Sequence, residues 1–320
     1  MARETETDTG PVGAAHVPVM VAEVVEWLRP RPGVRVVDAT LGFGGHAAAL
    51  LAAAPRACLL GIDRDPAALA HAQARLAREA ERVILRRARF GDLPATLAEL
   101  GWDGADAVLL DLGVSSLQLD DPARGFSFRA DGPLDMRMDP DQTLDADEVV
   151  NRWSGPELAR ILAEHGEERR ARAIARAIVR ARPLRSTGDL ARLVARVVGR
   201  RHSGLHPATR TFQAIRIAVN DELAALDQFL DAGYGVLRPG GRLAVLAYHS
   251  LEDRRVKEAF RRWAASCLCP PGVARCTCGW RAQVRVLTRR PVRPSPAEVL
   301  RNPRARSARL RVVERLGAQP

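Results

Sequence analysis

The first 112 residues alternate between short apolar runs and helix-like segments, and this alternation constrains the fold more than any other feature. The apolar runs predict four strands, at Val34–Asp38, Cys58–Asp63, Val83–Arg87 and Ala105–Leu112. The segments beside them predict helices at Val17–Leu28, Ala47–Ala54, Pro66–Ala80 and Leu93–Leu100. Because these strands are apolar along nearly their whole length, they predict a parallel sheet with helices on both faces.

This rhythm stops near residue 118. Residues 119–153 are rich in Asp, Pro and Arg and predict irregular structure, whereas 155–201 predict three amphipathic helices broken near Gly166 and at Arg182-Pro183. A longer helical stretch, Pro207–Leu237, ends in a predicted turn at 238–241. Strand signals then resume at Arg242–Tyr248, Gln283–Thr288 and Arg309–Val313.

The economical interpretation is an α/β sheet interrupted by an inserted all-helical domain of roughly 90–100 residues, which is an ordinary domain size. We expect a flexible tail at 1–15, a sheet domain formed by 16–118 and 214–320, and the insertion at 119–213. No run of about 18 apolar residues and no signal peptide is found, so the sequence predicts no membrane contact.

Basic charge is concentrated in two segments of a chain whose net charge is +11. Residues 160–201 contain twelve arginines against four acidic residues, and residues 281–315 contain eleven against two. Such clustering predicts a polyanion partner, nucleic acid above all, with a solvated helix face as the alternative. On the predicted helices Arg172, Arg176 and Arg180 share one face and are candidate phosphate contacts.

Five cysteines, an odd number, in a chain without an export signal indicate a reducing cytoplasm. Cys58 is interpreted as buried strand filler. The other four lie within twelve residues and could hold a structural zinc ion, but C-x-C pairs are less usual than C-x-x-C pairs. Reduced free thiols without a metal are therefore the expectation for Cys267, Cys269, Cys276 and Cys278.

A glycine cluster, Gly42–His46, follows the first strand directly and predicts a loop whose backbone contacts a ligand. It matches the dinucleotide pattern G-x-G-x-x-G/A, with Asp63 about the right distance on to bind a ribose, but one such match is weak. Asp38 and Asp111, at two strand ends, suit a cationic group better than a pyrophosphate. S-adenosylmethionine is therefore the favoured ligand, with a nicotinamide dinucleotide or no cofactor as alternatives.

Eight motifs in one order resemble the bacterial cytosine-N4 methyltransferases of 16S ribosomal RNA, the RNA of the small ribosomal subunit. They are Gly42–His46 (GFGGH), Asp63–Asp65 (DRD), Asp111–Gln118 (DLGVSSLQ), Arg124–Phe128 (RGFSF), Leu134–Asp139 (LDMRMD), Thr211–Leu223 (TFQAIRIAVNDEL), Tyr248–Arg254 (YHSLEDR) and Asn302–Ser307 (NPRARS). The matching stretches run from His16 to Arg309 and cover essentially everything but the N-terminal tail.

The resemblance implies a class I, Rossmann-like S-adenosylmethionine-dependent methyltransferase whose insertion helps to bind substrate. It implies N4-methylation of one cytidine of 16S ribosomal RNA near the decoding centre, in the small subunit or its precursor, and it allows a homodimer. The implied cofactor contacts are Gly44, Gly45, His46, Asp63, Phe90, Asp111 and Gln118.

Two strand ends supply the candidate catalytic groups. Asp111 could take the proton released by the cytosine amine or hold the amino group of the methyl donor, and the sequence leaves both open. His249 could accept the proton or bind a phosphate, with a structural histidine as the alternative. Tyr248 could stack on a flipped base, and Arg254 is a further candidate RNA contact.

Two rival functions remain at this point. One is a small-molecule oxidoreductase that uses the glycine loop for a nicotinamide cofactor, which would leave the arginine clusters without a role. The other is a non-catalytic ribosome-assembly factor, against which the intact loop and the intact Asp63, Asp111 and Gln118 argue.

Overall fold

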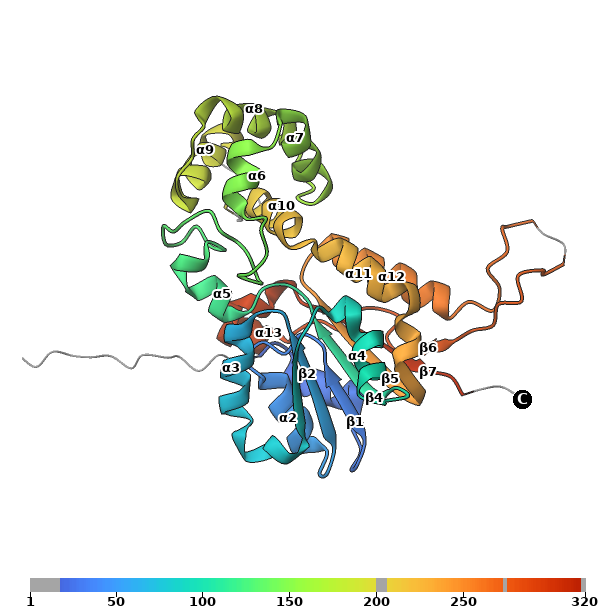
Figure 1. Cartoon of the computed structure of the whole chain (residues 1–320). Helices are drawn as coiled ribbons and strands as arrows, with labels where there is room; N and C mark the ends of the chain where they lie inside the picture. Colours follow the sequence, from blue (N-terminus) through green and yellow to red (C-terminus); the bar gives the residue numbers. More distant parts are fainter. Residues whose placement is uncertain (1–17, 200–205, 273–274, 318–320) are drawn as a thin grey trace, which may run out of the picture.

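The computed structural model describes residues 18–199, 206–272 and 275–317, and these contain a seven-stranded sheet (Figure 1). The strand order is β3-β2-β1-β4-β5-β7-β6. Neighbouring strands from β3 to β5 are parallel, and β7 is antiparallel to both β5 and β6. This arrangement confirms the predicted α/β class. The strands are β1 Arg35–Asp38, β2 Cys58–Asp63, β3 Val83–Arg87, β4 Ala105–Asp111, β5 Leu237–Ala247, β6 Val284–Val286 and β7 Arg309–Arg315.

Helices cover both faces of the sheet. One face carries α1 Val21–Leu28, α2 Gly45–Ala53 and α3 Pro66–Arg75. The other carries α4 Leu93–Glu99, α11 Glu222–Ala232 and α12 Ser250–Trp263. The strand residues alternate between these two cores, so that Val36, Leu59 and Leu109 face the first helices while Val37, Leu60 and Leu110 face the second. Burial on both faces is the reason why these strands are apolar throughout.

Shorter elements complete the sheet domain. The described residues include α5 Ser116–Asp120 and α13 Pro296–Arg301, and 3-10 helices at Ala77–Arg82, Phe90–Asp92, Pro122–Arg124, Gly233–Val236 and Pro303–Ser307. No helix among these described segments is both long and apolar enough to cross a membrane.

The insertion forms a separate core beyond the end of β4 and lies above the sheet in Figure 1. It is built from α6 Ala146–Arg152, α7 Gly155–Glu164, α8 Ala171–Ala181, α9 Thr187–Val198 and α10 Thr209–Asn220. The three helices predicted within 155–201 are α7, α8 and α9, so that prediction is confirmed. Apolar residues three and four apart give each of them one buried side, as Ile174 and Ile178 do on α8.

The domain boundary predicted at residue 213 lies inside α10. Phe212, Ile215 and Val219 of this helix belong to the core of the insertion, so the insertion extends to Asp221. Residues 119–153, predicted to be irregular, contain α6, which starts where the Asp145 side chain accepts a hydrogen bond from the Glu148 amide. The predicted tail at 1–15 lies outside the described residues.

Three further predictions need correction. The single helical stretch expected at Pro207–Leu237 is divided between α10 and α11, because Asp221 adopts a left-handed conformation with φ 52°. Residues 238–241, predicted to form a turn, lie within β5, where pairing with β4 begins at Leu237 before a bulge. Cys58 is exposed rather than buried, since it is the first residue of β2.

Helix α8 offers a matched test of the core of the insertion. Ile178 is fully buried, whereas the adjacent Val179 is 41% exposed. Ile178→Ala should lower the free energy of unfolding by about 2–5 kcal/mol, because it removes buried methyl groups and leaves a cavity. Val179→Ala should change it by less than about 0.5 kcal/mol. Urea unfolding followed by circular dichroism measures both, and equal losses in the two variants would contradict this packing.

Candidate functional site

A cavity of about 430 Å³ lies at the carboxyl edge of the sheet, where the strand ends face the insertion. The chain that follows each of β1 to β5 contributes to its wall, and Met138 and Arg216 of the insertion also line it. Among the predicted site residues, those that line the cavity are Gly45, His46, Asp63, Phe90, Asp111, Gln118 and Tyr248. The structure therefore brings together, in one cavity, residues that are up to 203 positions apart in the sequence.

Asp63 holds the glycine loop against the end of β2. Its carboxylate accepts hydrogen bonds from the backbone N–H of Gly42 at 2.8 Å and of Asp65 at 2.9 Å. Burial raises the pKa of this carboxyl, and the two N–H groups act in the opposite direction. Asp63 is thus a half-buried acidic group that is held by two backbone N–H groups, one in the glycine loop and one after β2.

Gly44, an expected cofactor contact, is not part of the cavity wall. It precedes α2 with φ 71°, and a Cβ at this position would come within 3.3 Å of the Ala72 Cβ on α3. The backbone conformation and the close helix packing are each sufficient to require a glycine here. Gly45 lines the cavity, and a Cβ there would clash with Pro18.

Asp111, at the end of β4, lies between a tyrosine and a histidine. The Tyr248 hydroxyl donates a hydrogen bond to Asp111 Oδ1 at 2.6 Å, and His46 Nδ1 lies 3.6 Å from Asp111 Oδ2. Burial raises the pKa of Asp111, while His46 and the Tyr248 hydroxyl oppose that rise. Burial, together with the Asp111 carboxylate, also raises the pKa of Tyr248, so this phenol remains a hydrogen-bond donor.

The tautomer of His46 follows from its second nitrogen. Nε2 lies 2.8 Å from the carbonyl oxygen of Val19, and a carbonyl oxygen only accepts, so Nε2 carries the hydrogen. In the neutral ring, Nδ1 then presents its lone pair toward Asp111. A proton placed between Nδ1 and the Asp111 carboxylate would be shared by two acceptors.

Asp38, at the end of β1, is a buried acid behind the same loop. Burial raises its pKa to about 7, against the opposing effect of His46. Its Oδ1 accepts from the Thr40 amide at 3.3 Å, and within the described part of the chain Oδ2 has no hydrogen-bond partner. A carboxyl held this way binds a proton or a cation readily. This agrees with the prediction from the sequence that Asp38 suits a cationic group.

Gln118 connects the cavity wall to the start of the insertion. Its amide nitrogen donates to the buried Asp65 carboxylate at 3.0 Å, and its amide oxygen accepts from the Ser115 amide at 3.0 Å. Arg124 donates to the same Asp65 oxygen at 2.9 Å. The amide group of Gln118 is therefore occupied by the protein, although the residue itself lines the cavity.

An ion pair that the sequence did not reveal lies on the opposite wall. Arg216 of α10 and Glu222 of α11 form two hydrogen bonds, at 2.8 and 2.9 Å, across the break at Asp221. Both side chains are largely buried and both line the cavity. Arg216 lies within the motif TFQAIRIAVNDEL, but an arginine on an amphipathic helix normally indicates a solvated face.

His249 and Arg254 have structural partners instead of the expected functional ones. His249 is the N-cap of α12, with Nδ1 accepting from the Glu252 amide at 3.4 Å and Nε2 lying 3.1 Å from a Glu252 carboxylate oxygen. It is not among the residues that line the cavity. Arg254 pairs with Glu167 of the insertion at 3.1 Å and so connects the two domains. The structural alternative for His249 is therefore the one that the structure favours.

Phe90 lies at the wall formed after β3. Its ring meets that of Phe229 edge to face, with centroids 6.4 Å apart, and it remains half-buried at the cavity. A flat apolar surface of this kind suits a heterocyclic base.

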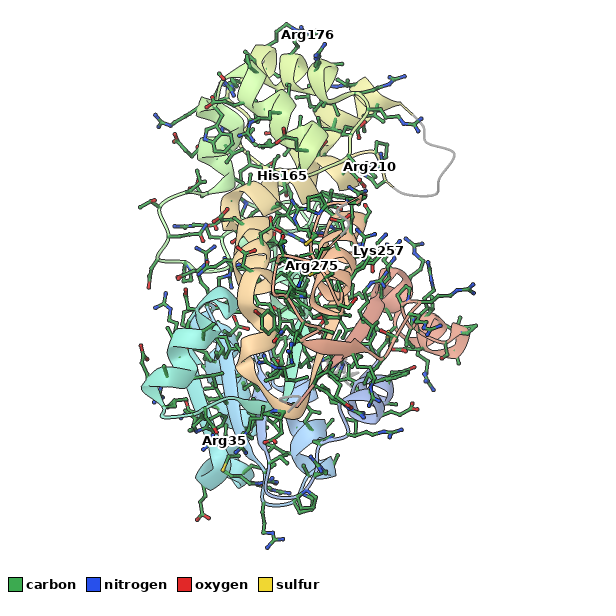
Figure 2. The ribbon with its side chains drawn as sticks, turned by 90° about the vertical axis from the view of Figure 1, so that its right-hand side faces the viewer. Arg35, His165, Arg176, Arg210, Lys257 and Arg275 are labelled. Carbon is green, nitrogen blue, oxygen red and sulfur yellow. The ribbon has the colours of Figure 1, made fainter. Side chains whose placement is uncertain are left out.

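The α8 arginines do not line this cavity. Arg172, Arg176 and Arg180 are exposed, and Figure 2 shows Arg176 at the end of the molecule opposite Arg35. Among the residues described, none of the three forms an ion pair, whereas Arg152, Arg160 and Arg192 pair with acids on their own helices. The α8 face is therefore free to meet an external anion.

The four clustered cysteines also lie outside the cavity wall. Their sulfur atoms come together in the segment between α12 and β6, all within 4.8 Å of one another. They form a second feature of the molecule, separate from the cavity.

The comparisons with known proteins agree with this geometry. The model of the MraW methylase family matches residues 13–316. Ribosomal RNA small subunit methyltransferase H of Thermomicrobium roseum is 54% identical over 310 residues, which are 96% of this chain and 95% of the relative. Proteins of the same name from Nitratidesulfovibrio vulgaris strain DP4 and Geobacter sulfurreducens are 50% and 52% identical, over 99% and 94% of this chain and 100% and 99% of the relatives.

These similarities extend over the sheet, the cavity and the insertion together. They remove the nicotinamide oxidoreductase from consideration and confirm the class I methyltransferase fold. The chain belongs to the MraW methylase family and is a methyltransferase that takes its methyl group from S-adenosylmethionine.

Proposed function

We propose that this protein methylates the exocyclic N4 amine of one cytidine in 16S ribosomal RNA, near the decoding centre of the small ribosomal subunit. The observation that carries the proposal is the hydrogen-bonded, half-buried Asp111–Tyr248 pair in a cavity that is shared between the sheet edge and a basic insertion. Relatives named ribosomal RNA small subunit methyltransferase H support the substrate class. The eight motifs described above support cytidine N4 and the decoding centre.

The acids of the cavity fit the methyl donor, which carries a positive sulfur and an ammonium group. Burial raises the pKa values of Asp63 and Asp111 in the cavity wall and of Asp38 behind the glycine loop, so a cation bound near them would relieve the cost of ionising them. When bound, the donor supplies an electrophilic methyl group. In our proposal Asp63 binds the ribose of the donor and Phe90 contacts its adenine. Gly45 and His46 line the part of the cavity that holds the methionine end, and Gln118 completes the cavity wall.

Asp111 is proposed to receive the cytosine amine. Its carboxylate accepts an N–H of that amine, which favours the pyramidal nitrogen needed for attack, and it takes the proton that the methylated amine must lose. The raised pKa brings the carboxylate closer to the basicity that this task needs. The Tyr248 hydroxyl orients Asp111 through Oδ1, and His46 Nδ1 lies 3.6 Å from Oδ2.

The insertion is proposed to bind ribosomal RNA at a distance from the reacting base. The arginine face of α8 does not line the cavity, so it would contact phosphates elsewhere on the particle rather than the target nucleotide. This geometry favours the small subunit or its precursor over a short RNA. Such a substrate implies a cytoplasmic location, and because every residue named comes from one chain, the proposal does not depend on a homodimer.

Transfer of labelled methyl from S-adenosylmethionine to undermodified small subunits tests this function. Nucleoside analysis of the extracted RNA should find the label in N4-methylcytidine, and free 16S ribosomal RNA should be a poorer acceptor than the particle. Label in another nucleoside would contradict the proposed specificity. Particle binding without any transfer would favour the non-catalytic assembly factor.

The role of Asp111 can be tested with a change to the carboxylate and a change to its tyrosine partner. Asp111→Asn should lower the transfer rate by about 10²–10⁴-fold, the usual contribution of a positioned base. Tyr248→Phe removes a hydrogen bond that lowers the pKa of Asp111. That pKa should then rise, and the acidic limb of the pH–rate profile should move to higher pH.

Tyr234→Phe is the matched control, because Tyr234 is the other of the two tyrosines and packs against Trp263 outside the cavity. Superimposable pH profiles for the two phenylalanine variants would contradict the role of Tyr248. If Asp111→Asn lowers donor affinity as much as it lowers the transfer rate, Asp111 holds the amino group of the donor instead.

If the α8 arginines bind RNA phosphates, they should contribute to the salt dependence of binding to the small subunit. Replacing Arg172, Arg176 and Arg180 together by Gln should weaken binding to the small subunit and flatten the plot of log affinity against log salt. The slope should fall by about 0.7 for each arginine that binds a phosphate of single-stranded RNA. The control replaces Arg152, Arg160 and Arg192, which carry the same charge but are paired locally. Equal slopes for the two triple variants, measured by filter binding, would leave α8 as plain solvated surface.

A further inference from the structure

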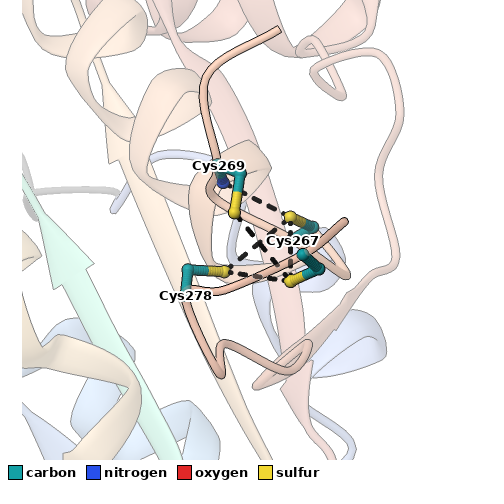
Figure 3. Close-up of side chains that lie close together, drawn as sticks. Cys267, Cys269 and Cys278 are labelled. Carbon is teal, nitrogen blue, oxygen red and sulfur yellow. Dashed lines mark hydrogen bonds between the residues drawn. The ribbon is translucent and has the colours of Figure 1, made fainter. Parts of the chain in front are cut away.

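Four cysteine sulfurs converge in the segment between α12 and β6 (Figure 3). Cys267 Sγ lies 3.4 Å from Cys276 Sγ and 3.7 Å from Cys278 Sγ. Cys276 Sγ lies 3.9 Å from Cys269 Sγ and 3.5 Å from Cys278 Sγ. Two C-x-C pairs, separated in the sequence by a turn that contains Pro270-Pro271 and Gly272, thus present their thiols to a common centre.

These separations are those of a tetrahedral metal site. A zinc ion bound by four thiolates at about 2.3 Å would place the sulfurs about 3.8 Å apart, which is the edge of the tetrahedron. The four sulfur–sulfur separations lie within about 0.4 Å of that edge length. A disulfide would instead need two sulfurs about 2.05 Å apart, and all four cysteines are free thiols.

Backbone N–H groups are directed at the sulfurs. The amides of Leu268, Cys269 and Thr277 donate to the sulfurs of Cys278, Cys267 and Cys269 at 3.4, 3.3 and 3.4 Å respectively. Hydrogen bonds of this kind stabilise the thiolate form, which is the form that binds metal. Four thiolates this close together repel one another unless a cation lies between them.

We propose that Cys267, Cys269, Cys276 and Cys278 together bind one Zn²⁺ as a closed structural site. All four positions of the tetrahedron are occupied by protein sulfur, so the ion has no open position for substrate or water and serves to fold the chain. An iron–sulfur cluster would need its four thiolates spread around a larger group of atoms than one ion. This assignment replaces the expectation of free thiols without a metal.

The ion would supply the stability that this segment lacks in apolar contacts. Cys267, Cys276 and Cys278 are exposed, and so is Leu268 beside them. The base of the segment is held separately, since Trp280 Nε1 donates to the Ala265 carbonyl at 3.0 Å and the Trp280 ring meets Tyr234. A zinc ion would cross-link the segment above that base, as disulfides and metals do where a core cannot form.

Metal analysis of the full-length protein, purified without chelator and under reducing conditions, tests the site. We expect close to one zinc per chain, and at least tenfold less in the Cys276→Ser/Cys278→Ser double variant. Cys58→Ser is the matched control, because Cys58 is an exposed thiol at the start of β2 and should leave the zinc content unchanged. None of the five described cysteines lines the cavity, so all of these variants should bind S-adenosylmethionine as the parent does. Retained affinity for this donor shows that the variants are folded.

A thiol titration gives a second, independent readout. In the zinc-loaded protein only Cys58 should react quickly with a thiol reagent, and all five cysteines should react once a chelator has removed the metal. The proposal would be overturned if the protein contained no zinc after incubation with Zn²⁺, or contained iron instead. It would also be overturned if the double variant kept its zinc, or if all five cysteines reacted quickly in the presence of zinc. None of these readouts depends on methyl transfer or on RNA, so they stand apart from the proposed function.

Discussion

The buried carboxylate of Asp65 joins three parts of the molecule at the edge of the sheet. One oxygen caps α3 through the Ala67 amide at 3.0 Å, and the other accepts from Gln118 at 3.0 Å and from Arg124 at 2.9 Å. Arg124 also donates to the carbonyl of Met138, a residue of the cavity wall. Removing one partner from such a buried pair typically costs about 3–5 kcal/mol, so the positions of the insertion and of the sheet edge depend on this contact.

The site depends on that junction because neither domain encloses the cavity alone. The strand ends supply Asp63, Asp111 and Tyr248, and the insertion supplies Met138 and Arg216. The charged groups are also divided between the two domains. Acids whose pKa values are raised by burial gather near the glycine loop, whereas the exposed arginines of α8 lie at the far end of the insertion. A cationic donor and a polyanionic substrate can therefore be attracted to different parts of one protein without competing.

Much of this fold could be predicted from the sequence, because β1, β2 and β4 are largely apolar and each ends in an aspartate at the same edge of the sheet. The remainder depended on contacts between distant residues. The left-handed Asp221 divides a continuous helical pattern, and the pairing of Leu237 with Ala105 turns a predicted turn into strand. Among the site residues, Asp63, Asp111 and Tyr248 were expected at the cavity and lie there. Arg216 was missed because its partner, Glu222, lies across the helix break, and His249 could be identified as a helix cap only once Glu252 was seen beside it.

A structure of the protein bound to the small ribosomal subunit, with S-adenosylhomocysteine present, tests the central claim most directly. Our account predicts the target cytidine flipped into the cavity, with its N4 within hydrogen-bond distance of an Asp111 carboxylate oxygen and the α8 arginines on RNA phosphates. A cytidine whose N4 faces another side chain, or an insertion directed away from the RNA, would contradict it.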